Sequence, residues 1–128
     1  MVSDYSDDLN DITYEIIGAC MKVYNTLGKG FLESVYMDCL SIEFNLRNIH
    51  FEKEKKFEII YENIKIPHSY RADFVIEQKI ILEIKAQANV IEENIKQTLN
   101  YLAVSKCKIG LIINFGENSL KYKRVILT

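Results

Sequence analysis

The sequence has few of the residues that break or cross-link a chain. Pro67 is the only proline, and no linker, internal repeat or low-complexity segment interrupts the 128 residues. We therefore expect one domain over residues 1–128, large enough to bury about two thirds of its unfolded surface. The three cysteines are odd in number and scattered through apolar segments, which favours reduced core thiols over a disulfide framework.

Long apolar runs and a strong net charge are also missing. No run approaches the roughly 20 residues of a membrane span, and the acidic first eight residues do not resemble a signal peptide. We expect a cytoplasmic protein without membrane contact. The net charge of −2 gives no overall attraction to nucleic acid, so phosphate binding would need a local patch. Two cation clusters qualify, although each is as simply explained as a solvated strand face: Lys53, Lys55 and Lys56, and Lys121, Lys123 and Arg124.

The sequence has too few histidines, in the wrong places, for a zinc site or a serine nucleophile activated by histidine. His50 and His68 are the only histidines, and neither has cysteines at the spacing of zinc ligands. Ser34 and Ser69 have no histidine placed by any sequence signal to activate them. The sequence therefore favours neither a zinc site nor a serine nucleophile.

Hydrophobic periodicity predicts an α/β fold. Helices are expected from Asp7 or Asp8, as a cap, to about residue 27, and at about residues 31–46 and 90–105. Strands are expected at residues 51–62, 64–66, 71–77, 80–86, 109–115 and 122–127. The order ααβββαβ, with a further edge strand, predicts a mixed central sheet flanked by helices.

Three charged residues stand within the most apolar of these strands. Glu83 and Lys85 lie two residues apart in a run of branched apolar residues, so they share one face of a strand. Asp73 interrupts the preceding apolar run, and a short turn separates the two. If the turn centres on Gln78, Asp73 faces Glu83 with their Cβ atoms about 5 Å apart.

Two explanations of this trio are open. An unpaired buried charge is costly, so such groups normally have a partner or a metal. Lys85 could satisfy both acids in a buried ion-pair network, or a divalent cation could relieve the repulsion between Asp73 and Glu83. Three charges on one face of an otherwise apolar hairpin favour a site.

Two helical residues also interrupt apolar stripes. Glu33 heads the stripe formed by Met37, Leu40 and Phe44, so it points toward the core or a cleft beside it. A glutamate favoured by the helix dipole explains the same position equally well. Gln97 is polar within an apolar stripe, and a structural amide bonded to nearby backbone is the simpler explanation of it.

Six segments together resemble a known family. Residues 30–36 (GFLESVY) resemble the signature of the bacterial GxxExxY proteins, a branch of the PD-(D/E)xK nuclease superfamily. The similarity continues in the same order through residues 70–73, 82–86, 97–102, 110–116 and 123–125, so it spans about residues 9–127. It implies a restriction-endonuclease-like core, αβββαβ, preceded by an extra helix.

The resemblance also implies a role for each candidate residue. Asp73 and Glu83 are similar to the metal-binding acids of the superfamily, and Glu33 to an additional metal-binding acid on a helix. Lys85 is similar to the residue that orients or activates the attacking water. Gln97 is similar to a helix glutamine that helps to position the lysine or that water.

The function implied by this resemblance is hydrolysis of phosphodiester bonds in nucleic acid, with DNA favoured over RNA. Such hydrolysis needs charge neutralisation on a phosphoryl oxygen and a nucleophile at neutral pH, and Mg²⁺ or Mn²⁺ held by carboxylates supplies both. A homodimer is a further expectation, because a short nuclease often needs a second copy to grip a duplex. The alternative is a catalytically idle protein of the same fold that serves as a nucleic-acid-binding or protein-assembly module.

Overall fold

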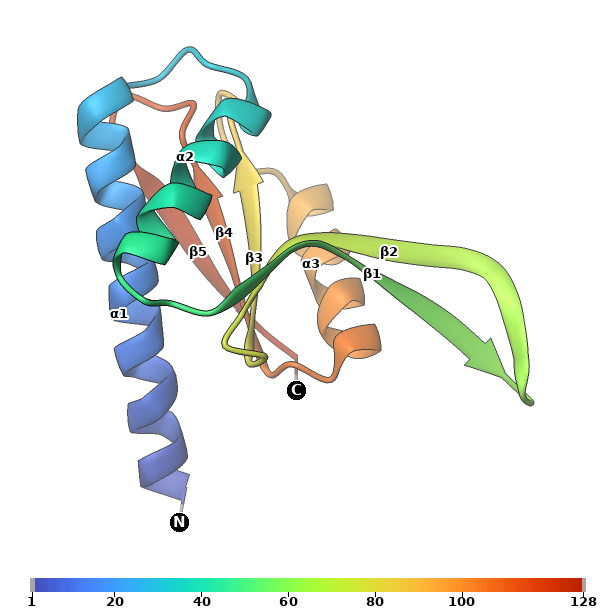
Figure 1. Cartoon of the computed structure of the whole chain (residues 1–128). Helices are drawn as coiled ribbons and strands as arrows, with labels where there is room; N and C mark the ends of the chain where they lie inside the picture. The colour runs from blue at the N-terminus through green and yellow to red at the C-terminus, as the bar shows by residue number, and fades with distance from the viewer. Residues whose placement is uncertain (1, 128) are drawn as a thin grey trace.

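Three helices and five strands make up the computed structural model, which describes residues 2–127 and the side chains of residues 9–127. The elements are α1 (Val2–Leu27), α2 (Glu33–Leu46), β1 (Phe51–Tyr61), β2 (Ile64–Ile76), β3 (Ile80–Lys85), α3 (Glu92–Ser105), β4 (Ile109–Asn114) and β5 (Lys121–Ile126) (Figure 1). The predicted mixed α/β class and restriction-endonuclease-like order are confirmed. Among the described residues, no helix has both the length and the hydrophobicity to cross a membrane.

Two predicted boundaries were wrong. Helix α1 begins at Val2, so it runs past Asp7 and Asp8 instead of being capped by either. Strand β2 runs unbroken through Pro67, where two separate strands were predicted. The β1–β2 pairing shifts register just there, so Pro67 lies outside the paired positions and its missing N–H costs no ladder hydrogen bond.

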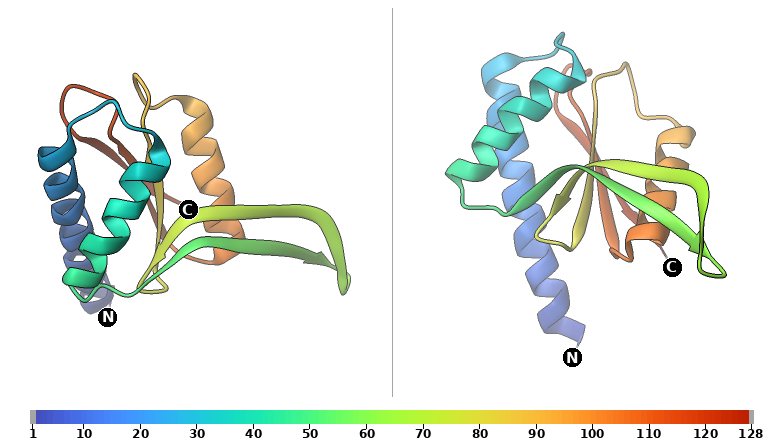
Figure 2. Two further views of the ribbon diagram at one scale, coloured as in Figure 1. Left: turned by 45° about the horizontal axis from the view of Figure 1, so that its top comes forward. Right: turned by 45° about the vertical axis from the view of Figure 1, so that its right-hand side comes forward.

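The strands form one sheet in the order β1-β2-β3-β4-β5. Strands β3 and β4 run parallel and are joined through α3, whereas all other neighbours are antiparallel. Helices α1 and α2 cover one face of the sheet and α3 covers the other (Figure 2). Strand β4 is buried along its whole length, as expected for a central strand with both faces covered.

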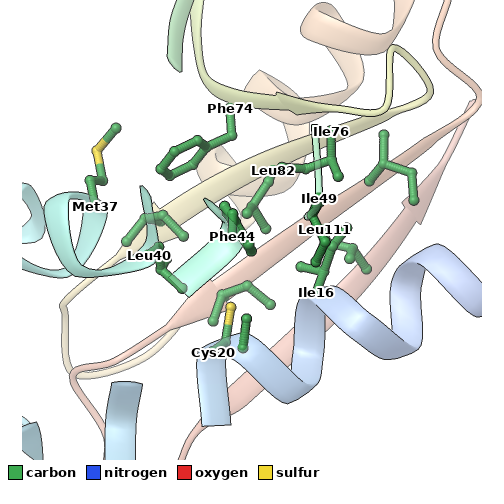
Figure 3. Close-up of a cluster of buried hydrophobic side chains, with 14 of the residues drawn as sticks. Ile16, Cys20, Met37, Leu40, Phe44, Ile49, Phe74, Ile76, Leu82 and Leu111 are labelled. Carbon is green, nitrogen blue, oxygen red and sulfur yellow. The ribbon is translucent and has the colours of Figure 1, made fainter. Parts of the chain in front are cut away.

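A hydrophobic core fills each side of the sheet. The larger core lies under α1 and α2, where the ring of Phe44 packs against that of Phe74 (Figure 3). The ring of Phe44 also packs against Phe51. Alternate residues of β3 divide between the two cores, with Leu82 on the α1–α2 side and Ile81 on the α3 side. This alternation decides which way the charged residues of β3 project.

Helix α3 packs on the sheet with most of its apolar stripe and with two further residues. Ile95, Leu99 and Leu102 pack against the core on this side of the sheet, whereas Ile91 is exposed. Thr98 and Tyr101 are buried beside them. The methyl group of Thr98 fits over Gly110 of β4, where a Cβ atom would lie only 2.6 Å from it. The missing side chain of Gly110 therefore lets α3 approach β4 on its Thr98 face.

The hairpin of β1 and β2 projects beyond the rest of the sheet as an arm (Figures 1 and 2). We call residues 55–71 the arm. Its outer part exposes large apolar side chains, those of Ile60, Tyr61 and Ile64. At its root Glu54 has a φ of 54°, which is uncommon for a residue other than glycine and marks a kink in β1.

Candidate active site

The turn between β2 and β3 sets the register of the acidic pair. Ile76 pairs with Ile80 and Phe74 with Leu82, so the turn centres on Gln78 as predicted. Glu77 and Gln78 both have positive φ, as the tight hairpin turns that match strand twist require. In this register the next pair is Asp73 and Glu83.

Hydrogen bonds confirm that Asp73 and Glu83 are neighbours on adjacent antiparallel strands. The backbone N–H of Asp73 donates to Glu83 Oε2 at 2.9 Å, and the N–H of Ile84 donates to Asp73 Oδ2 at 2.8 Å. Each carboxylate thus bonds to the backbone of the opposite strand. The two side chains replace the regular ladder at the point where β2 leaves β3 to enter the arm.

Lys85 lies on the same face as Glu83. Both residues alternate with Ile84, which belongs to the core under α1 and α2, so their side chains project toward α3. Burial raises the pKa of Asp73 and of Glu83, and the positive charge of Lys85 opposes that rise. Yet none of the ion pairs among the described residues joins Lys85 to either acid. The acids accept hydrogen bonds from backbone N–H groups, so the ion-pair network, one of the two explanations left open by the sequence, is not formed.

The two acids are held in an environment that disfavours their charge. Glu83 is only 2% exposed, and burial together with the neighbouring charge of Asp73 raises its pKa to about 8. Burial also raises the pKa of Asp73, against the lowering effect of the Ile84 N–H and Lys85. A cation bound between these two partly desolvated acids would therefore stabilise their charged forms.

Glu33 approaches this pair from the first turn of α2. It is exposed, but its negative charge raises the pKa of both Asp73 and Glu83, so the three carboxylates share one electrostatic environment. Glu54 was not predicted as part of the site. It lies opposite Asp73 in the β1–β2 register, and its charge also raises the pKa of Asp73.

Helix α3 supplies Tyr101, a second residue that the sequence did not single out as part of the site. Burial first, and then the charges of Glu83 and Asp73, raise the pKa of Tyr101 to about 12. Gln97 lies one turn earlier on α3, is exposed, and makes no hydrogen bond to either carboxylate within the described part of the chain. Its predicted role stays a prediction.

The donor set suits a hard cation, although it is not a ready-made cage. Within residues 9–127, no three His, Cys, Asp or Glu side chains are grouped so that they could hold a metal ion. Asp73 and Glu83 each give one oxygen to a backbone N–H, which leaves the other oxygen of each carboxylate. Mg²⁺ is typically bound by one or two carboxylates together with water and substrate phosphates, so this pair fits it chemically.

A sequence model described as the PD-(D/E)XK nuclease superfamily matches residues 10–125. The chain belongs to this superfamily. Nucleases of this superfamily generally use divalent metal ions. The match confirms the resemblance at the level of the superfamily, whereas assignment to the GxxExxY branch stays a prediction.

A solved structure supports the same fold. The crystal structure of SSO0001 resembles this chain with a TM-score of 0.59 and 20% sequence identity. The similarity covers 73% of this chain and 50% of that one, so the chain spans about half the length of that protein. At this identity the likeness concerns the fold alone. None of the curated proteins matches the chain.

Proposed function

We propose that this protein is a metal-dependent nuclease that hydrolyses phosphodiester bonds in nucleic acid, DNA in preference to RNA. The observation that carries the proposal is the pair formed by half-buried Asp73 and buried Glu83. Each accepts a hydrogen bond from the opposite strand, beside Lys85, in a chain of a nuclease superfamily. A structural role alone does not require two repelling acids at a position that raises the pKa of both.

Asp73 and Glu83, with Glu33 as the third acid, would hold the cation, which we propose to be Mg²⁺ or Mn²⁺. When bound, such an ion neutralises charge on a phosphoryl oxygen and lowers the pKa of water. The protein residues keep the acids in place through the two backbone hydrogen bonds and exclude water from most of Glu83.

Lys85 would act on the attacking water in this proposal. It projects from β3 on the face of Glu83, is half-buried, and carries a charge that both acids sense. An ammonium in that position can orient the water and stabilise negative charge that develops on the phosphate. Gln97 would help to position Lys85 or the water, from one turn before Tyr101 on α3.

Finer assignments belong to the same proposal. The segment Gly30 to Tyr36 supports the GxxExxY branch, and a cytoplasmic location follows from the proposed activity on cellular nucleic acid. A homodimer is also proposed, because a second copy would extend the grip of the site on nucleic acid.

One observation favours a second candidate, a catalytically idle binding or assembly module. The hydrogen bonds from the Asp73 and Ile84 N–H groups satisfy one oxygen of each acid without a cation, so the pair can also act as a structural clamp between β2 and β3. In this case the acids would stabilise the hairpin and take no part in chemistry.

Metal titration and a cleavage assay separate the two candidates. Mn²⁺ and Mg²⁺ are titrated by calorimetry into the wild type, Asp73→Ala and, as a matched control, Asp11→Ala at an exposed position of α1. Cleavage of single-stranded, duplex and structured DNA and RNA is followed with each metal and with EDTA. The nuclease proposal expects binding and cleavage that Asp73→Ala abolishes and Asp11→Ala retains. Cleavage that survives EDTA or the Asp73→Ala substitution would contradict the nuclease proposal. If the wild type neither binds metal nor cleaves any substrate, the binding or assembly module is the function that stands.

A further inference from the structure

A cleft of about 500 Å³ separates the arm from the C-terminal half of α3. The arm contributes the ring of Tyr70 and the aliphatic side chain of Ile59, and α3 contributes Val104 and the amide of Asn100. An aromatic ring, aliphatic surface and an amide that both donates and accepts hydrogen bonds suit a flat heterocycle with polar edges.

The charges around the cleft favour an anion. Its one acid, Glu58, forms an ion pair with Lys65, and the hydrogen bond and charge of Lys65 lower the pKa of Glu58. On the opposite wall stands Lys106, which forms no ion pair with any described acid. Because Lys65 neutralises Glu58 and no described acid neutralises Lys106, the cleft has a net positive charge. A heterocycle that carries a phosphate meets both requirements.

Two tyrosines lie between the cleft and the acidic pair. Tyr70, which lines the cleft, packs edge-on against Tyr101 with their ring centroids 5.7 Å apart. Tyr101 in turn lies close enough to Glu83 and Asp73 for their charges to act on it. A chain bound between the arm and α3 would therefore run toward the candidate active site.

We propose that this cleft binds one unpaired nucleotide next to the bond that is cut, so that the substrate is single-stranded at the site. The proposal rests on the nuclease function proposed above. Tyr70 would contact the face of the base, Asn100 its polar edge, and Lys106 the phosphate. A base within a duplex has both faces covered by its neighbours and cannot enter such a cleft unless it leaves the stack.

Binding without metal tests the cleft independently of cleavage. Short labelled single strands of DNA and RNA, and a duplex of equal length, are titrated with the full chain in EDTA, and binding is followed by fluorescence anisotropy. The variants are Asn100→Ala and Ala103→Phe, both at exposed positions of α3 where the fold tolerates change. Asn25→Ala, at an exposed position of α1, is the matched control. A third variant, Tyr70→Leu, tests the stacking contact directly.

The wild type should bind the single strands more tightly than the duplex. Each cleft variant should weaken single-strand binding by about tenfold, which is the scale of one stacked base, and Asn25→Ala should leave it unchanged. Equal binding of single strand and duplex, or Asn100→Ala and Ala103→Phe proteins that bind like the wild type, would overturn the cleft proposal. Metal-dependent duplex cleavage beside unaffected variants would overturn it while the nuclease function stands. Weaker binding by the variants, without cleavage by the wild type, would uphold nucleotide binding in the cleft and refute the nuclease function.

Discussion

Glu83→Gln should make the protein more stable at alkaline pH and change little near pH 5. The pKa of Glu83 in the folded protein is about 8, whereas its ordinary value is 4.5. Between these values the native state keeps a proton that the unfolded state releases, so the free energy of unfolding falls as pH rises from about 4.5 to about 8. Glutamine is close in shape, carries no charge, and keeps an oxygen to accept the hydrogen bond from the Asp73 N–H.

The size of the effect follows from the same two values. One unit of pKa corresponds to about 1.4 kcal/mol, so the charged Glu83 lowers stability by at most about 5 kcal/mol above pH 8. Relaxation around a buried charge reduces such costs. We therefore expect Glu83→Gln to raise the free energy of unfolding by roughly 2–5 kcal/mol near pH 9. The variant also removes a negative charge beside Asp73, whose raised pKa acts in the same direction.

Urea unfolding of both proteins near pH 5 and near pH 9, without metal, measures the difference, because other titrating groups cancel between them. Glu93→Gln, at an exposed position of α3, is the control and should behave like the wild type. Added Mn²⁺ should stabilise the wild type near pH 9 more than Glu83→Gln, since binding to the native state raises its stability. A Glu83→Gln protein no more stable than the wild type near pH 9 would refute the inference that this acid is buried at a cost.

Three further predictions concern other residues. Lys85→Met should leave Mn²⁺ affinity largely intact in calorimetry, because a cation is no ligand, yet lower turnover by roughly 10²–10⁴; a parallel loss of metal affinity would contradict this. Asn114→Leu should lower the free energy of unfolding by about 2–4 kcal/mol in urea, because the buried Asn114 amide bonds to the Gln87 N–H and carbonyl and to Glu117. A loss under about 1 kcal/mol would contradict it. Gly116→Ala should lower the melting temperature in calorimetry, because its Cβ would lie 2.3 Å from the Gln87 backbone; an unchanged value would show that the two loops can separate.

The acidic pair could be predicted because it depends on local pattern. A strand period of two and a short turn at Gln78 are enough to bring Asp73 opposite Glu83, and the structure has that register. The way in which the acids are satisfied could not be predicted. Lys85 was the obvious partner in the sequence, but β2 and β3 separate at this point and expose backbone N–H groups to the carboxylates.

Other parts of the site depend on tertiary packing, which the local sequence pattern does not predict. Tyr101 is buried beside the apolar residues of α3, and Gly110 of β4 leaves room for Thr98, so a missing side chain sets how closely the helix approaches the sheet. Glu54 looks like one of several alternating charges on a solvated strand. Only the kink at its own backbone, opposite Asp73, brings it to the acids.

The hairpin between β2 and β3 also bears on the order of events in folding. Asp73 and Glu83 are ten residues apart, so they meet when a short loop closes, which takes little chain entropy and about microseconds. Their burial needs β4 and α3, which come later in the chain and join β3 through a parallel crossover. The two carboxylates can thus come together while water still screens them, and lose that water only when β4 pairs with β3 and α3 packs Tyr101 and Leu102 over the sheet. The last steps of folding are those that set the charge state of the pair.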